Sequence, residues 1–222
     1  MYWGIFILTM LASWLVSALF KNRMRKYSEL HTSMTGREVA ERMLRENGIT
    51  DVQVTCTEGT LTDHYNPVDR TVNLSRDVYE GANLAAMAVA AHECGHAVQH
   101  AVGYAPLRMR SALVPVVNFS ARWVTWVILA GMLVLQQFPQ LMLFGIALFA
   151  MTTLFSFITL PVEINASVRA INWMEESMLV AREDLPKASA ALRSAAYTYV
   201  VAALASLATL LYYIAIYSGS RR

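Results

Sequence analysis

Long uncharged apolar stretches are the feature that most restricts how this chain can fold. The first covers residues 2–20, and three more follow at about residues 116–136, 140–160 and 195–217. At about 1.5 Å per residue, a helix of this length crosses a hydrocarbon layer of ~30 Å. Hydrophobic residues make up 56% of the 222 residues and charged residues 15%, which is too apolar for an ordinary soluble protein. The sequence therefore predicts a mainly α-helical membrane protein with about four transmembrane helices.

The basic residues predict how these helices are oriented. A basic cluster within residues 21–26 follows the first apolar stretch, whereas a cleaved signal peptide carries its positive charges before it. Residues 1–20 are therefore expected to stay as an anchor, with the N-terminus outside and the following chain in the cytoplasm. The uncharged string QQFPQ separates the next two stretches and suits an outside loop, so residues 114–161 are predicted to form a transmembrane hairpin. The last span would then end outside, where Arg221 and Arg222 modestly violate the positive-inside rule.

A small cytoplasmic α+β domain is predicted between the first two spans, within residues 21–113. Apolar residues at helical spacing predict a helix over residues 35–48. The strings DVQVTC and TVNLS alternate apolar and polar residues, with turn signals between them, and predict a sheet of two or three strands. A second helix is predicted over residues 84–101, capped by Asn83 and stopped at Gly103.

The string AHECGHAVQH lies on this second helix and carries the residues suited to chemistry. His92 and His96 are four positions apart, so their rings lie one turn apart on the same face and can reach one ion. Two neutral imidazoles suit Zn²⁺, and catalytic zinc sites keep one position for water. Glu93 projects to the side of the ion, where a general base for that water is needed. The alternative, a pair of hydrogen-bonded core histidines, does not explain a carboxylate beside them in an apolar helix.

The neighbouring residues are not expected to bind this metal. Cys94 lies about 200° around the helix from His92, so it should face the core. His100 repeats the four-residue step, but it lies too far along the helix to share the ion and is expected at the surface or behind the ligands. Cys56 and Cys94 are too few for a disulfide framework, and they fit a reduced compartment.

Two histidines and a water leave one protein ligand missing. The third apolar stretch returns to the cytoplasmic side at TLPVEINASVRA, and Glu163 is the first carboxylate after it, within a predicted cytoplasmic helical segment of residues 162–194. An acidic residue there could instead stabilise the positive end of a helix. Four rival carboxylates lie in a more charged stretch: Glu175, Glu176, Glu183 and Asp184. Glu163 is therefore the favoured third ligand.

The strings AVAAHECGHAVQ, LPVEINASVRA, GTLTDHYNP and VNLS together resemble the YugP-type membrane zinc metallopeptidases of bacteria, relatives of the HtpX and CAAX-prenyl protease group. The resemblance covers most of residues 30–215. It implies a zincin-like domain in which zinc is bound by His92, His96 and Glu163. It also implies that Glu93 is the general base.

Further roles are implied by the same resemblance. In many such enzymes an Asp four residues after the ligand Glu supports the first histidine; here that residue is Ser167, so support would be weaker or would come from Asn165. The strand TVNLS is expected to border the cleft and to hold an extended peptide by backbone hydrogen bonds. His64 and Tyr65 are candidate donors to the oxyanion, and Arg169 is another. Turn formation explains the string DHYNP equally well.

The sequence thus predicts a multi-pass cell-membrane zinc metalloendopeptidase, with its site facing the cytoplasm and a zinc-activated water as the nucleophile. Two alternatives stay open. One is a non-catalytic membrane scaffold stabilised by zinc, in which His64 or Cys56 would be a fourth ligand. The other is an intramembrane protease of the site-2 type, which would carry the motif inside a span.

The expected partners follow from this function. They are the lipid bilayer and a peptide or protein substrate, with membrane proteins among the candidates. A regulatory membrane partner or an oligomer is also expected, because unrestrained proteolysis in the cytoplasm would be harmful. A net charge of only +2 gives no reason to expect nucleic acid.

Overall fold

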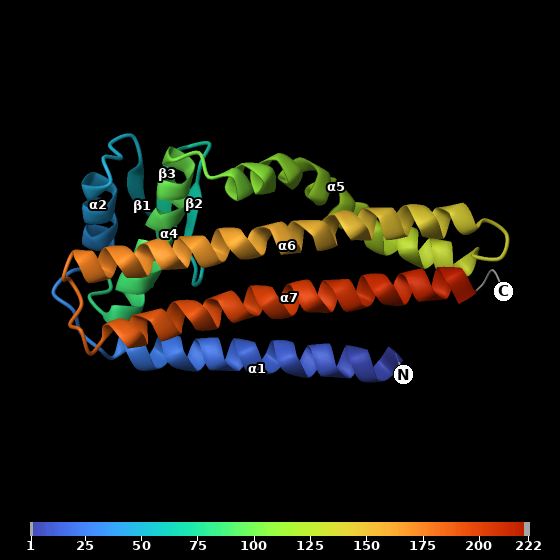
Figure 1. Cartoon of the computed structure of the whole chain (residues 1–222), viewed down its shortest axis with the longest axis horizontal. Helices are drawn as coiled ribbons and strands as arrows, with labels where there is room; N and C mark the ends of the chain where they lie inside the picture. The colour runs from blue at the N-terminus through green and yellow to red at the C-terminus, as the bar shows by residue number, and fades with distance from the viewer. Residues whose placement is uncertain (1, 220–222) are drawn as a thin grey trace.

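The computed structural model describes residues 2–219 and is mainly helical. The elements follow in the order α1 (Tyr2–Ser28), α2 (Gly36–Glu46), β1 (Gln53–Thr57), β2 (His64–Asn66), β3 (Thr71–Ser75), α3 (Arg76–Tyr79), α4 (Leu84–Ala101), α5 (Ala105–Leu133), α6 (Pro139–Glu176) and α7 (Leu185–Gly219). The long helices α1, α7 and α6 lie side by side in that order, and α5 packs on α6 (Figure 1). The sheet, α2 and α4 gather at one end of these helices, and the N-terminal end of α1 and the C-terminal end of α7 lie toward the other.

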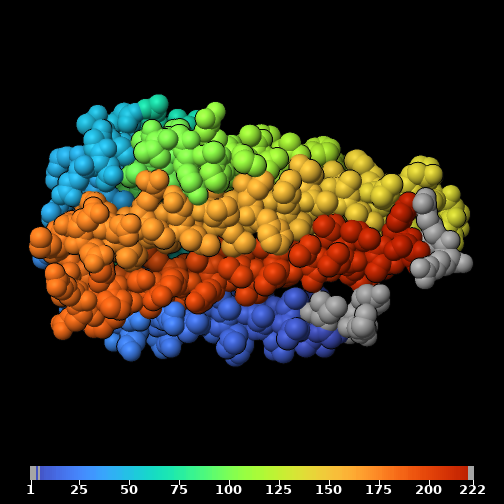
Figure 2. All heavy atoms as spheres, in the orientation of Figure 1, coloured from blue at the N-terminus to red at the C-terminus, as the bar shows by residue number. Residues whose placement is uncertain are grey.

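Within the described residues, three helices are long and apolar enough to cross a membrane: α5, α6 and α7. They contain the second, third and fourth apolar stretches, so the prediction of three such helices is confirmed by length and composition. Large apolar side chains stay exposed on each of them, including Trp126, Phe144 and Leu211, as contact with lipid requires. Figure 2 shows α6, α7 and α1 forming one long side of the molecule. The first predicted span lies in α1, and its crossing of the membrane stays a prediction.

The helix that contains the third apolar stretch continues beyond it. Pro161 lies inside α6, which continues to Glu176, so the predicted cytoplasmic segment 162–194 consists of the end of α6, a short connection and the start of α7. Glu163 therefore lies deep within a helix that begins at Pro139. The alternative that Glu163 stabilises the positive end of a helix is wrong, because that effect is confined to the first turn.

The two predicted helices of the small domain are present with their predicted ends. Thr35 is the N-cap of α2 and forms a capping box with Glu38. The side chain of Asn83 accepts a hydrogen bond from the backbone N–H of Ala86 at the start of α4. Gly103 follows the end of α4 with a φ of +66°, a conformation that glycine adopts without steric cost.

The sheet has three strands in the order β1-β3-β2, with β3 parallel to β1 and antiparallel to β2. The string TVNLS is β3, so it is the central strand, and Val72 and Leu74 from it are buried in the domain core. Strand addition needs an edge with unpaired backbone groups, so residues 71–73, which are paired on both sides, cannot hold an extended peptide in this way. Leu74 and Ser75 are paired with β1 alone, so for that end of the strand peptide binding stays a prediction.

A close contact between α4 and α6 decides where the polar residues of these helices meet. Gly95 on α4 faces the backbone of Ala166 on α6, and a Cβ atom at Gly95 would lie 2.6 Å from the Ala166 carbonyl oxygen. Glycine thus lets the two backbones approach more closely than any other residue would. This approach brings the histidine face of α4 onto the turn of α6 that carries Glu163.

Candidate metal centre

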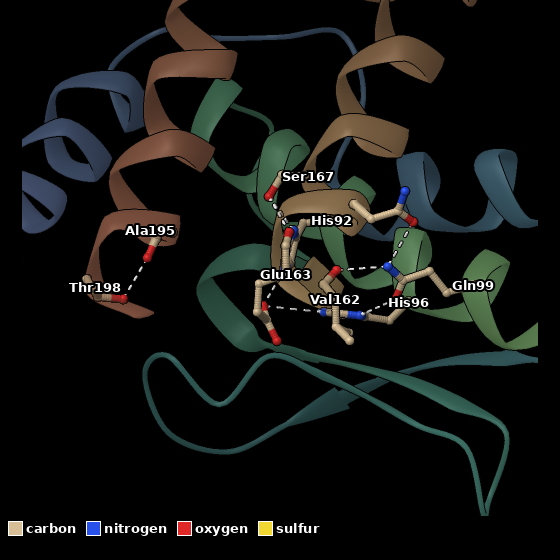
Figure 3. A network of polar contacts seen from close by, with 9 residues as sticks. His92, His96, Gln99, Val162, Glu163, Ser167, Ala195 and Thr198 are labelled. Carbon is tan, nitrogen blue, oxygen red and sulfur yellow. Dashed lines mark hydrogen bonds and ion pairs between the residues drawn. The ribbon is translucent and has the colours of Figure 1, made fainter. Parts of the chain in front are cut away.

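Three side chains from α4 and α6 converge on one point. The Nε2 atoms of His92 and His96 lie 3.3 Å and 3.6 Å from Oε2 of Glu163. The ligand atoms of these residues all lie within 4.8 Å of one another, and the two imidazole rings meet edge to face. Figure 3 shows the rings and the carboxylate pointing toward one another. The structure therefore brings together the three residues that the sequence singled out as metal ligands.

The far nitrogen of His92 is held by Ser167. The Ser167 hydroxyl oxygen lies 3.1 Å from Nδ1 of His92, and its hydrogen is donated to the backbone carbonyl of Glu163 at 3.0 Å. The hydroxyl must then accept from the imidazole, so Nδ1 carries the proton and Nε2 offers a lone pair toward Glu163. Of the two supports weighed for the first histidine, Ser167 makes the contact and Asn165 does not.

The far nitrogen of His96 is held by Gln99, a residue that the sequence analysis did not identify. The amide nitrogen of Gln99 donates to the carbonyl of Val162 at 2.8 Å and to the side-chain oxygen of Asn165 at 3.0 Å. Its amide oxygen therefore faces Nδ1 of His96 at 3.0 Å and accepts the proton from it. A flipped amide would set its oxygen against two acceptors. Gln99 is fully buried, and its place one turn after His96 in an apolar helix is the sequence signal for this role.

The charge environment of His96 favours a cation. Burial lowers the pKa of His96, but its interaction with Glu163 and the nearby charge of Glu93 outweigh burial, so the pKa lies above its ordinary value. A set of carboxylates that stabilises positive charge on an imidazole also stabilises a divalent ion at the same point.

The residues fit a zinc ion in chemistry and in number. Two imidazole nitrogens with their far nitrogens protonated, together with one carboxylate, form the ligand set of one class of catalytic zinc site. Within residues 2–219, His92, His96 and Glu163 form the one group that could hold a metal. The fourth ligands considered for a purely structural site lie elsewhere, since Cys56 is exposed on β1 and His64 contacts the carbonyl oxygen of Thr62.

A cavity of about 220 Å³ opens beside these ligands and contains the side chain of Glu93. Glu93 is buried, and its carboxylate makes no hydrogen bond or ion pair with any described residue. The part of the lining that comes from α1 and α7 is mostly apolar: Phe20, Met24, Ala191, Leu192, Ala195 and Ala196. The carboxylate is thus free to act on a molecule in the cavity.

The other candidate residues are placed away from this cavity. The hydroxyl of Tyr65 contacts Nδ1 of His100 at 2.7 Å, and Arg169 donates to Asn165 at 2.8 Å. Neither these two residues nor His64 belong to its lining, so their role as oxyanion donors stays a prediction. Cys94 faces the core, as expected, and burial raises the pKa of its thiol.

Comparison with known proteins gives one family. The family model described as "Putative neutral zinc metallopeptidase" matches residues 2–218. The chain is 42% identical over 203 residues to the protein named "Putative membrane protease YugP" of Bacillus subtilis (strain 168), a match that covers 90% of this chain and 89% of that protein. No solved structure matches significantly.

Proposed function

Because this chain belongs to the neutral zinc metallopeptidase family, we propose that it is an integral membrane endopeptidase whose active centre is His92, His96 and Glu163, with Glu93 as the general base. The observation that carries the proposal is the convergence of these three ligands beside a cavity that holds an unpaired carboxylate. A zinc ion bound there would lower the pKa of a water molecule toward 7 and polarise a peptide carbonyl.

The chain's own residues supply the proton transfers. Glu93 accepts a proton as a water oxygen attacks the carbonyl carbon, and the electron pair of the C=O bond moves onto the carbonyl oxygen. The C–N bond then breaks as Glu93 returns the proton to the leaving amine. Glu93 has no fixed partner among the described residues, which supports this role, because a carboxylate held by a salt bridge would be a weaker base.

The second layer of contacts supports catalysis by fixing the histidines. Ser167 and Gln99 hold the Nδ1–H groups of His92 and His96, so both rings keep Nε2 directed at one point without rearrangement. The carbonyls that anchor this layer belong to α6, the helix that carries Glu163. The supports of both histidines therefore connect α4 to the helix that carries Glu163.

The substrate proposed for this site is a peptide segment with apolar side chains beside the cleaved bond. Phe20 and Met24 from α1 and Leu192 from α7 line the cavity, and such walls bind apolar groups. Membrane proteins are substrates of this kind. A cytoplasmic orientation follows from the positive-inside rule, with the basic cluster at residues 21–26 on the side of the small domain. A regulatory membrane partner would restrain cleavage.

The two alternatives have less support. A structural zinc site usually has four protein ligands, whereas this group contains three among the described residues. A site-2-type protease would carry its histidines within a membrane span, but α4 is not among the three membrane-length apolar helices of the described chain.

The test uses the full chain purified in detergent, with zinc measured by mass spectrometry and cleavage measured on an unfolded protein substrate. Wild type is expected to bind one zinc per chain and to cleave. Glu93→Gln should keep the zinc and lose at least ~10³-fold in kcat, a loss at the level of a general base. Glu163→Ala should lose the zinc.

The exposed carboxylate Glu175 gives a matched control, since Glu175→Gln changes the same charge outside the site and should leave both properties unchanged. Zinc-loaded wild type that cleaves no substrate, or a Glu93→Gln variant with full activity, would contradict the proposal.

A further inference from the structure

Peptide hydrolysis by this site needs a donor for the oxyanion that develops on the carbonyl oxygen. Carboxylates such as Glu93 and Glu163 cannot serve, because when ionised they only accept hydrogen bonds. A polar side chain in the lining of the cavity can supply such a donor in addition to the polarisation that a bound zinc ion would provide.

Most candidate donors in this lining are already committed. The hydroxyl of Ser167 donates to the backbone carbonyl of Glu163, and that of Thr198 donates to the carbonyl of Ala195 at 2.6 Å (Figure 3). The Nδ1–H of His92 is directed at Ser167. The carboxylate of Asp63 accepts from the backbone and side chain of Ser75 and donates nothing. The cavity lining contains one further hydroxyl group.

That hydroxyl belongs to Tyr199 on α7. Tyr199 lines the same cavity as Glu93 and Glu163. A peptide that enters this cavity to reach Glu93 therefore also meets the wall that contains Tyr199. Tyr199 thus lines the cavity from α7, whereas His92 and Glu93 line it from α4.

A positive charge lies near this phenol. The guanidinium of Arg110 on α5 interacts electrostatically with Tyr199, and its Nε atom is buried without a hydrogen-bond partner among the described residues. Arg110 also lies over the ring of Phe155 at 6.0 Å. A positive charge behind a hydroxyl makes it a stronger donor toward a developing negative charge.

We propose that Tyr199 is a catalytic residue that donates a hydrogen bond from its hydroxyl to the oxyanion formed during peptide hydrolysis. The proposal rests on the proposed function and deepens it. The phenol keeps its proton throughout: the oxyanion gains its charge from the C=O electron pair, and Glu93 carries the transferred proton. When the C–N bond breaks, the carbonyl re-forms and the hydrogen bond weakens.

The test is Tyr199→Phe in the full chain, which removes the hydroxyl and keeps the ring. Zinc stoichiometry and the unfolding temperature should match wild type. The value of kcat should fall about 10²- to 10³-fold, as when an oxyanion donor is removed elsewhere, while KM changes by less than about threefold. Affinity for a peptide phosphonamidate, whose tetrahedral oxygens imitate the oxyanion, should fall by a similar factor. Affinity for the cleaved peptide product should not change.

Tyr197→Phe is the matched control, because Tyr197 lies on the same helix, is exposed and is not part of the cavity lining. It should behave as wild type in every measurement. The proposal is overturned if Tyr199→Phe keeps its kcat and its phosphonamidate affinity. It is also overturned if the variant loses zinc while each remaining zinc-loaded molecule cleaves at the normal rate, since Tyr199 would then only position Glu163. Failure of the proposed function would differ, because wild type itself would then be inactive.

Discussion

Gly95→Ala tests whether the contact between α4 and α6 builds the metal centre. The added Cβ would lie 2.6 Å from the carbonyl oxygen of Ala166 and 3.1 Å from its C and Cα atoms, so it meets backbone that cannot rotate away. Ordinary contact begins near 3.4 Å, so the two helices must separate by about 0.8 Å. Zinc–ligand distances tolerate changes of only about 0.2 Å. Because His92 and His96 lie on one helix and Glu163 on the other, the separation should weaken zinc binding at least about tenfold.

The assay measures zinc affinity by competition with a chelator, together with the thermal unfolding of the full chain in detergent. Overpacking of this kind costs roughly 1–3 kcal/mol in stability. Gly131→Ala is the matched control, because its Cβ would lie 2.7 Å from the backbone of Met142 where α5 meets α6, away from the ligands. It should cost similar stability and leave zinc binding unchanged. A Gly95→Ala protein with wild-type zinc affinity would refute the argument.

Three further predictions concern the residues that support the ligands. Gln99→Leu should reduce zinc affinity about 10- to 100-fold, because His96 loses the acceptor for its Nδ1–H. Competition with a chelator measures this affinity. An unchanged affinity would show that Gln99 does not support the metal centre. Ser167→Ala should lower zinc affinity less than Gln99→Leu does, because one hydroxyl is lost at a partly exposed position. Ser167→Asp should keep the wild-type zinc affinity, because a carboxylate also accepts a hydrogen bond from Nδ1–H of His92. In the zinc-free protein the raised pKa of His96 means that its protonation stabilises the fold. That contribution is fully present below the unfolded pKa of about 6.5 and is lost as pH rises through the folded pKa. Denaturant unfolding of chelator-treated protein should therefore show that the free energy of unfolding falls across this pH range. His96→Gln should remove this pH dependence.

Features set by neighbouring residues in the chain could be predicted. The limits of α4 depend on the cap at Asn83 and the left-handed residue Gly103, and both signals are local. The pairing of His92 with His96 follows from the four-residue spacing on a helix. The apolar stretches predicted α5, α6 and α7, because the length and composition of a membrane helix are also properties of one segment.

Features that depend on which segments of the chain contact each other could not be predicted from the sequence. The alternation in TVNLS predicts a strand but not its neighbours, so its central place in the sheet was missed. The predicted hairpin ended at residue 161, yet α6 continues through Pro161, because packing against its neighbours can hold a helix across a proline.

The sequence by itself determined the helices, the histidine pair and the acidic residue beside it. Only the tertiary structure decided how Glu163 meets the histidines, which side chains hold their Nδ1 atoms, and that Tyr199 reaches the same cavity from α7. The physical reason is distance along the chain. The contact at Gly95 joins helices that lie far apart in sequence, and the side chains it brings together carry no shared spacing or pattern that would reveal it.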